Sequence, residues 1–222
     1  MTEGKHPHSE KRLRAGLERF GLDQALAEPL MRYLGELEKW NATYNLSGIK
    51  FVDEMVTRHV FDSLVVLQAL PAYESGTRML DAGSGAGIPG LILAIVRPDL
   101  KITTLDSAGK KARFMRHAIR TLGLANAEVF EGRCEDHHPA EPYPLIISRA
   151  FASLADFIGV TAHLGGPDTR WLSMKAHVDA AEKAGLPEGF RIDSTHRLLV
   201  PGLDEMRQLL IISGPRSGDP VL

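Results

Sequence analysis

Apolar residues in the first 70 positions recur at the three- and four-residue steps of amphipathic helices. One stripe includes Leu30, Leu34 and Leu37, with charged residues between them, and a second stripe stops before Pro71. Helices tend to end before a proline because its ring restricts the preceding residue to extended geometry. The pattern predicts a helical region over residues 1–70, whose first 20 or so positions we expect to form a mobile tail.

From residue 78 onward, short apolar runs typical of buried strands alternate with helical patterns. The expected strands cover 78–80, 102–105, 127–130, 145–147, 171–174, 190–200 and 208–212, and the expected helices cover 89–96, 109–122, 154–163 and a segment after 177. Such alternation implies a parallel sheet with helices on both faces, closed here by two paired terminal strands. We therefore expect an α/β protein. Residues 71–222 would form a Rossmann-like domain with a mostly parallel seven-stranded sheet, and residues 1–70 would pack on it as an N-terminal helical cap.

The composition is that of a soluble globular protein and excludes several other classes. Of the 222 residues, 44% are hydrophobic and 24% are charged, which excludes a disordered chain and a coiled-coil rod. The longest apolar stretches fall far short of the ~18 residues of a membrane span, and the polar N-terminus is unlike a signal peptide. The single cysteine, Cys134, cannot form an internal disulfide, so we expect a cytoplasmic protein with no membrane partner.

The formal net charge of −2 argues against a protein that coats nucleic acid, but the charges are unevenly distributed. Residues 101–120 hold six basic side chains and one acidic residue, Asp106. Such a cluster can attract phosphates locally, although a solvated helix face would show the same pattern. The residues of this segment that are candidates for RNA binding are Lys110, Lys111, Arg113 and Arg116.

A glycine-rich turn follows the first expected strand. Asp81 ends the strand, Gly83, Gly85 and Gly87 follow at alternate positions, and a helix begins near Pro89. Glycine permits positive φ and lets a ligand approach the backbone closely, while the N-terminus of a helix offers free N–H groups. In open parallel sheets the ligand crevice lies at the carboxyl ends of the strands. The turn therefore predicts a ligand site.

Two ligands are compatible with this turn. A dinucleotide-binding pattern begins at Gly85, with Asp106 close to the expected distance downstream for a ribose hydroxyl. The alternative frame begins at Asp81 and resembles motif I of methyltransferases that use S-adenosylmethionine (SAM). Pro89 lacks an N–H that a pyrophosphate could use, and Asp81 would repel a pyrophosphate but suits the ammonium group of methionine. These points favour SAM over a dinucleotide.

Six short segments, spread over residues 34–212, resemble motifs of one known family. They are Lys39-Trp40-Asn41-x-x-Tyr44-Asn45-Leu46-Ser47, Arg58-His59-x-x-Asp62-Ser63, the turn from Asp81 to Gly90, Leu105-Asp106-Ser107-x-x-Lys110-Lys111-x-x-Phe114-Met115, Ser148-Arg149-Ala150-Phe151-Ala152-Ser153-Leu154, and Val200-Pro201-Gly202-Leu203. In this order they resemble the bacterial 16S rRNA guanine-N7 methyltransferases, also called the glucose-inhibited division protein B (RsmG/GidB) family. One departure is Ala176, which follows Lys175 where the family pattern has glycine.

The resemblance implies a Rossmann-like SAM-dependent methyltransferase fold. It implies methylation of N7 of a guanosine in 16S rRNA, guanosine 527 in the usual rRNA numbering. The implied cofactor contacts are Gly83, Ile88, Cys134, Glu135 and Arg149, with Asp106 on the ribose by the general methyltransferase pattern. The remaining candidate cofactor residues belong to the turn: Asp81, Gly85 and Gly87.

Methyl transfer to guanine N7 needs no general base, because N7 carries a free lone pair and no proton. The enzyme must mainly align the reactants, which can lower the barrier by roughly 7–11 kcal/mol. We therefore expect no catalytic triad, no metal and no covalent nucleophile. The candidates for positioning the guanine are Arg149, His59, Asn45 and Lys175. For Arg149 the alternative is a structural salt bridge, and for His59 it is a hydrogen-bonded packing histidine.

Two further function classes are open at this point. A dinucleotide in the turn would make the protein an NAD-dependent oxidoreductase, and a vestigial cofactor site would leave a non-catalytic RNA-binding module. The favoured partner is 16S rRNA or the small ribosomal subunit. We infer no protein partner from the sequence and expect a monomer.

Overall fold

The computed structural model describes residues 6–70 and 73–215. The helices are α1 (Pro7–Arg19), α2 (Ala27–Tyr44), α3 (Val52–Met55), α4 (Asp62–Leu64), α5 (Gly90–Val96), α6 (Gly109–Leu122), α7 (Leu154–Thr161) and α8 (Ala180–Ala184). Short 3₁₀ turns lie at Gln24–Leu26, Val65–Gln68, Cys134–Asp136 and Ala162–Leu164, and a π-helical turn lies at Val56–Phe61. The strands are β1 (Arg78–Ala82), β2 (Lys101–Asp106), β3 (Ala127–Glu131), β4 (Leu145–Ser148), β5 (Arg170–Lys175), β6 (Arg191–Leu198) and β7 (Arg207–Ser213).

The strands form one seven-stranded sheet in the order β3-β2-β1-β4-β5-β7-β6. β1 to β5 run parallel, whereas β7 is antiparallel to both β5 and β6. This arrangement confirms the predicted α/β class, the mostly parallel sheet and the pairing of the last two strands. The strand order reverses between β1 and β4, so a crevice is expected at the carboxyl ends of these two strands.

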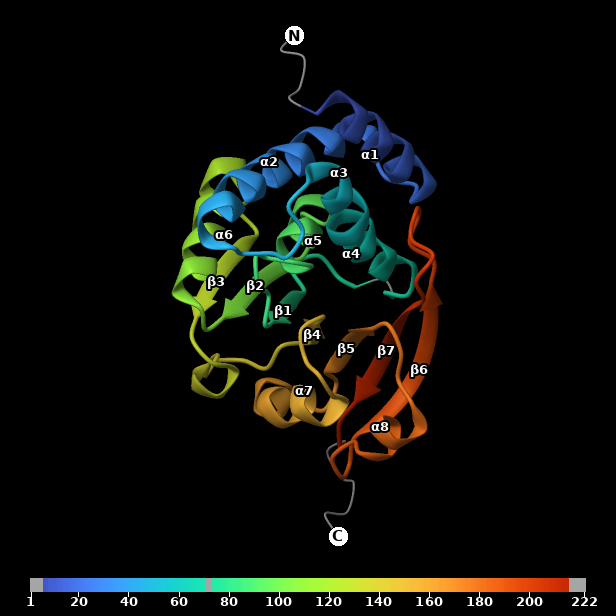
Figure 1. Cartoon of the computed structure of the whole chain (residues 1–222). Helices are drawn as coiled ribbons and strands as arrows, with labels where there is room; N and C mark the ends of the chain where they lie inside the picture. The colour runs from blue at the N-terminus through green and yellow to red at the C-terminus, as the bar shows by residue number, and fades with distance from the viewer. Residues whose placement is uncertain (1–5, 71–72, 216–222) are drawn as a thin grey trace.

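Helices cover both faces of the sheet (Figure 1). The N-terminal helices lie on the same side as α5 and α6, and α7 and α8 lie on the opposite side. α2 packs along α6, and the buried Tyr33 of α2 donates a hydrogen bond from its hydroxyl to the Ala86 carbonyl at 2.8 Å. The N-terminal helices therefore share a core with the sheet and reach its glycine turn directly.

Residues 7–19 differ from the sequence prediction. They form helix α1, with Leu13 and Leu17 fully buried, so the expected mobile tail is wrong for this segment. The helix approaches the π turn so closely that a Cβ on Gly16 would lie 2.1 Å from a ring carbon of Phe61. A stripe of only three small or apolar positions was too short to predict this helix. Residues 1–5, the start of the predicted tail, lie outside the described residues.

None of the described helices combines the length and the apolar composition that crossing a membrane requires.

Candidate functional site

The glycine turn between β1 and α5 is held from beneath by Asp81. Its carboxylate is fully buried, and Oδ2 accepts hydrogen bonds from the Ser84 hydroxyl and from the Gly90 backbone N–H, the latter at 2.8 Å. Burial raises the pKa of Asp81 to about 6. The structure does not bring this carboxylate to the protein surface. Asp81 thus holds the turn through Oδ2, while Oδ1 is buried without a hydrogen-bond partner among the described residues. The expected contact with a methionine ammonium stays a prediction.

The turn requires glycine at several positions. Gly83, Gly85 and Gly87 have φ of 71°, 62° and 90°, a region that other residues rarely adopt. At Gly83 a Cβ would lie 2.9 Å from the Cβ of Ala150, so the chains after β1 and β4 can meet only without a side chain there. The result is a backbone-lined surface between two parallel strands.

A cavity of about 370 Å³ opens beside this turn, and we call it the Asp106 cavity. Its candidate residues are Gly83, Asp106, Lys111, Cys134 and Glu135. Asp106 ends β2, and its two oxygens accept hydrogen bonds from the backbone N–H groups of Gly85 and Ala108, each at 2.9 Å. Burial raises the pKa of the Cys134 thiol to about 12, so Cys134 contributes a neutral wall. The cavity thus combines the fixed carboxylate of Asp106 with the charged side chains of Lys111 and Glu135 and with apolar surface.

A second cavity of about 230 Å³, the glycine-turn cavity, shares Gly83 and Ala150 with the first. Its other lining residues are Leu46, Ser47, His59, Ser84, Gly85, Ala86, Ile88 and Arg149. A third cavity of about 330 Å³, the Asp62 cavity, shares His59 and Arg149 with the second. The three cavities therefore follow one another, each joined to the next by common walls.

The Asp62 cavity is lined mainly by cationic side chains, three of which also pair with the carboxylates of Glu54, Glu182 and Glu205 outside the lining. It is lined by Arg58, Arg149, Lys175 and Arg207, against the single carboxylate of Asp62. Apolar and uncharged walls come from Ile49, His59, Met174, Ala176, Leu198 and Gln208. A cavity of this charge suits a ligand rich in hydrogen-bond acceptors or phosphates.

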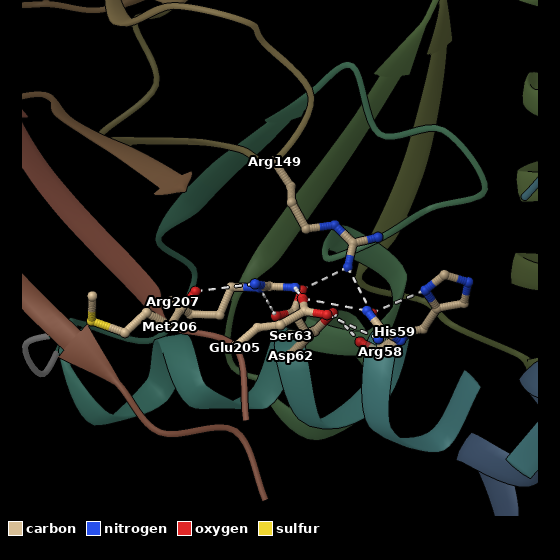
Figure 2. Close-up of polar contacts among 8 residues, drawn as sticks. All are labelled: Arg58, His59, Asp62, Ser63, Arg149, Glu205, Met206 and Arg207. Atoms are coloured by element: carbon tan, nitrogen blue, oxygen red, sulfur yellow. Dashed lines mark hydrogen bonds and ion pairs between the residues drawn. The ribbon is translucent and has the colours of Figure 1, made fainter. Parts of the chain in front are cut away.

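Asp62 organises the cations of this cavity (Figure 2). The carboxylate is 2% exposed and accepts from Arg149 Nη1 at 2.8 Å and from Arg207 Nε at 2.9 Å. Arg149 follows β4 and Arg207 begins β7, so the two guanidinium groups reach Asp62 from different strands (Figure 2). The salt bridge considered for Arg149 is present, yet the side chain also lines two cavities. Both roles are compatible.

His59 lies between the glycine-turn cavity and the Asp62 cavity. Its Nε2 is 2.9 Å from the Ser47 hydroxyl and its Nδ1 is 3.1 Å from the Arg58 carbonyl. Burial, assisted by the positive charge of Arg149, lowers the pKa of His59 to about 4. The ring is therefore neutral at physiological pH.

Two predicted guanine-positioning residues lie differently from the expectation. Lys175 lines the Asp62 cavity, but its ammonium donates to the carbonyls of Phe151 and Ala152 and pairs with Glu182 at 2.9 Å. These three partners use its three donors, so Lys175 holds the segment after β4. Asn45 ends α2 in the left-handed region with φ of 48° and lines a separate cavity with Lys50. The structure does not bring Asn45 to the Arg149 side chain.

The basic residues of α6 divide between two surroundings. Lys110 and Arg113 are exposed, and Lys110 donates to the Tyr44 carbonyl at 2.8 Å. Arg116 is exposed and pairs with Glu131. Lys111 instead lines the Asp106 cavity, with its Nζ 3.3 Å from Asp106. The predicted grouping of Lys111 with the phosphate-binding residues therefore does not match its position.

Sequence reasoning missed several residues that build the site. Arg207 is separated from Asp62 by 145 positions, and no local pattern marks it. Asn41 and Ser47 lay within a quoted motif but received no role. Tyr33 belonged to an apolar stripe, and its position gave no sign that its hydroxyl would reach the glycine turn. The partners of Arg207 and Tyr33 are 145 and 53 positions away, whereas those of Asn41 and Ser47 lie within 12 positions, around an irregular loop with no periodic pattern.

Comparisons with known proteins agree on one family. The family model described as rRNA small subunit methyltransferase G (GidB) matches residues 26–211. A protein named ribosomal RNA small subunit methyltransferase G from Pseudomonas aeruginosa is 46% identical over 207 residues, covering 92% of this chain and 95% of the relative. One of the same name from Pseudomonas syringae is 45% identical over 214 residues, covering 96% of this chain and 98% of the relative.

Solved structures show the same fold at low sequence identity. TrmN from Thermus thermophilus aligns with a TM-score of 0.56 at 19% identity, covering 72% of this chain and 53% of that one. A SAM-dependent methyltransferase from Aquifex aeolicus aligns with a TM-score of 0.51 at 17% identity, covering 69% of this chain and 90% of that one. The fold is thus that of SAM-dependent methyltransferases, which favours SAM over the dinucleotide of an NAD-dependent oxidoreductase. With a family match over most of its length, the chain belongs to the rRNA small subunit methyltransferase G family.

Proposed function

We propose that this protein transfers a methyl group from SAM to N7 of a guanosine in the 16S rRNA of the small ribosomal subunit. The names of its relatives support the RNA substrate, and the motif resemblance points to guanosine 527. The observation that carries the proposal is the succession of three cavities joined at Gly83 and Ala150 and then at His59 and Arg149. This order would place a nucleoside, a methyl donor and a target base in line.

The Asp106 cavity fits the nucleoside end of SAM. A carboxylate oxygen can accept two hydrogen bonds, so Asp106 can accept from one ribose hydroxyl at Oδ1 while it still accepts from Gly85, Ala108 and Lys111. The neutral Cys134 and the neighbouring Glu135 lie where the adenine would pack. At Gly85 no atom of the described residues beyond the chain neighbours lies within 4 Å of the place that a Cβ would occupy, so the backbone there is open to the ligand.

The glycine-turn cavity fits the methionine end. Arg149 lines it and can pair with a carboxylate, while Ile88 and Leu46 provide apolar surface. When bound, SAM supplies a methyl group on a positively charged sulfur. In this proposal the protein contributes alignment, because Arg149 faces both this cavity and the next.

The Asp62 cavity fits the target guanine. Guanine presents the acceptors N7 and O6 on one edge, and arginine is the side chain that most often recognises that edge. N7 must stay free to attack, so we propose that Arg149 donates to O6. A base reached in this way has to leave its stack, as in other enzymes that modify bases.

The surroundings of the proposed base agree with a reaction that needs no proton acceptor. Both oxygens of Asp62 accept from arginines, and the neutral His59 is hydrogen-bonded at both ring nitrogens. These groups are committed to holding the site. In-line transfer to N7 removes no proton from the nucleophile, so alignment of the reactants is the main requirement.

The test is methylation of small-subunit RNA from a strain that lacks the endogenous enzyme. Purified protein and tritiated SAM should label 16S rRNA, and cleavage with borohydride and aniline should stop reverse transcription at guanosine 527. Label at another atom or nucleotide would contradict the N7 assignment. RNA binding without label would favour a non-catalytic RNA-binding module, and tight NADH binding without SAM binding would favour an oxidoreductase.

A further inference from the structure

A chain of hydrogen bonds joins the end of α2 to Arg149 and passes through His59. It begins at Asn41, which is 6% exposed. The Asn41 amide donates from Nδ2 to the Ile49 carbonyl at 2.9 Å, and its Oδ1 accepts from the Ser47 backbone N–H at 2.8 Å. One side chain thus ties the loop of residues 45–50 to the last turn of the helix.

This loop forms walls of two of the three cavities. Leu46 and Ser47 line the glycine-turn cavity, and Ile49 lines the Asp62 cavity. Any shift of the loop would therefore change the space for the proposed methyl donor and the proposed base together.

The hydrogen bonds around His59 have a definite direction. The Ser47 hydroxyl oxygen accepts from the Ile49 N–H at 3.1 Å, which leaves the hydroxyl proton to donate to His59 Nε2 at 2.9 Å. The Arg58 carbonyl, 3.1 Å from Nδ1, can only accept. The hydrogen-bond network therefore assigns the ring proton to Nδ1 and makes Nε2 an acceptor.

The Arg58 carbonyl is shared. It also accepts from Arg149 Nη1 at 3.0 Å, so His59 and Arg149 meet at the same oxygen. Figure 2 shows the His59 ring and the Arg149 guanidinium converging near Arg58. Through this oxygen the loop of residues 45–50 is connected to the guanidinium that we propose binds both substrates.

We infer that His59 is a positioning residue in its Nδ1–H tautomer, and that Asn41 and Ser47 hold it there. In this arrangement His59 links the loop of residues 45–50 to the carbonyl that orients Arg149 and does not itself touch the guanine. The inference rests on the proposed function and deepens it, since His59 would not contact the guanine but would support Arg149 together with Asn41 and Ser47.

The tautomer can be tested without any activity. Long-range proton–nitrogen spectra of the full chain at pH 7 should show His59 with a protonated Nδ1 and an unprotonated Nε2. A ring protonated at Nε2, or a mixture of the two tautomers, would overturn the inference.

Two substitutions of His59 distinguish positioning from base contact. An asparagine amide nitrogen can occupy the place of Nδ1, whereas a glutamine amide reaches the place of Nε2. We expect His59→Asn to keep at least tenfold more kcat than His59→Gln, with the Kd for SAM unchanged within about twofold in both. Higher kcat in His59→Gln would mean that Nε2 contacts the substrate and would overturn the inference.

Asn41→Leu removes the amide that anchors the loop and keeps the branched shape of the side chain. We expect a mixed His59 tautomer and at least a fivefold loss of kcat, with SAM binding retained. Thr43→Ala, at an exposed position of the same helix, is the matched control and should keep wild-type kcat. A folded Asn41→Leu variant with an unchanged spectrum and unchanged kcat would overturn the role of Asn41. Failure of the wild-type protein to methylate small-subunit RNA would instead contradict the proposed function, and the tautomer assignment would stand.

Discussion

The two ends of the site each contain a buried carboxylate, but the partners differ. Asp106 accepts from backbone N–H groups of the turn and of the segment that directly follows β2. Asp62 accepts from arginine side chains 87 and 145 positions away. The first carboxylate is held by local backbone geometry and the second by long-range ion pairs. The comparison predicts that changes at Asp62 act mainly on the fold, and that changes at Asp106 act mainly on ligand affinity.

The largest expected effect is on stability. Asp62→Asn should lower the free energy of unfolding by about 3 kcal/mol, because it removes the counter-charge of the partly buried Arg149 and leaves Arg207 with Glu205 alone. We place the loss at the lower end of the usual range since Arg149 is partly exposed to the cavity. Urea unfolding provides the measurement. Glu205→Gln, which removes an exposed partner of Arg207, is the control and should change stability little. Equal stability of Asp62→Asn and wild type would show that the ion pairs do not hold this region.

The second effect is on SAM affinity and concerns Asp106, at the other end of the site. Asp106→Ala should weaken SAM binding tenfold to a hundredfold, since hydrogen bonds to a charged group contribute about 1.5–3 kcal/mol. Isothermal titration calorimetry measures the affinity. Glu131→Gln removes an exposed carboxylate of the next strand and should leave the affinity unchanged. If Asp106→Ala bound SAM as tightly as wild type, the proposed ribose contact would have to be abandoned.

A third effect separates the basic residues of α6. The double variant Lys110→Glu with Arg113→Glu should weaken RNA binding and reduce its salt dependence, because phosphate contacts release counterions. SAM binding should be unchanged. Lys111→Met should weaken SAM binding and leave RNA binding unchanged, because Lys111 faces Asp106 in the cavity. Filter binding at several salt concentrations, with calorimetry for SAM, tests both. Equal loss of RNA binding in the two variants would contradict this division of roles between Lys111 and the pair Lys110 and Arg113.

The smallest net effect in the wild-type protein is the pH dependence of stability, because two buried groups contribute to it with opposite signs. The pKa of His59 is lowered to about 4, so the unfolded chain binds more protons between pH 6.5 and 4, and stability falls as the pH falls through this window. The pKa of Asp81 is raised to about 6, so the folded chain binds more protons between pH 3.8 and 6, and stability falls as the pH rises.

The two contributions can be separated by denaturant unfolding from pH 4 to 7. Relative to wild type, His59→Asn should lose less stability toward acid, and Asp81→Asn should lose more. If the free energy of unfolding changed with pH in the same way for the three proteins, neither group would have a different pKa in the folded and unfolded states.

The fold and the Asp106 end of the site were largely predictable from the sequence. The strand and helix spacing after residue 78 fixes the alternation of elements, and the glycine spacing after Asp81 marks the turn. These features depend on neighbours within a few residues, so a local pattern contains the necessary information. The same reasoning located Asp106 at the end of β2, beside the turn that it contacts.

The Asp62 end was predictable only in part. The motif resemblance pointed to Arg149, His59 and Lys175, but the partners of these side chains depend on the packing of distant strands and helices. Arg207 lies in the site because β7 returns antiparallel beside β5. Asn45 adopts the left-handed conformation at the end of α2 and lines a separate cavity, while the residues that follow it line the site. Periodicity and spacing along the chain do not encode such pairings.

The π-helical turn at Val56–Phe61 makes the spacing of this segment as important as its composition. It lies directly before Asp62 and contains both Arg58 and His59, and such turns are frequent at functional sites. Deletion of one residue would let the turn relax to an ordinary helix, in which the residues of the turn shift by about 100° against their surroundings. Arg58 and His59 would then turn away from Asp62, although every side chain of the site was still encoded. In this stretch an indel would do more damage than most point substitutions.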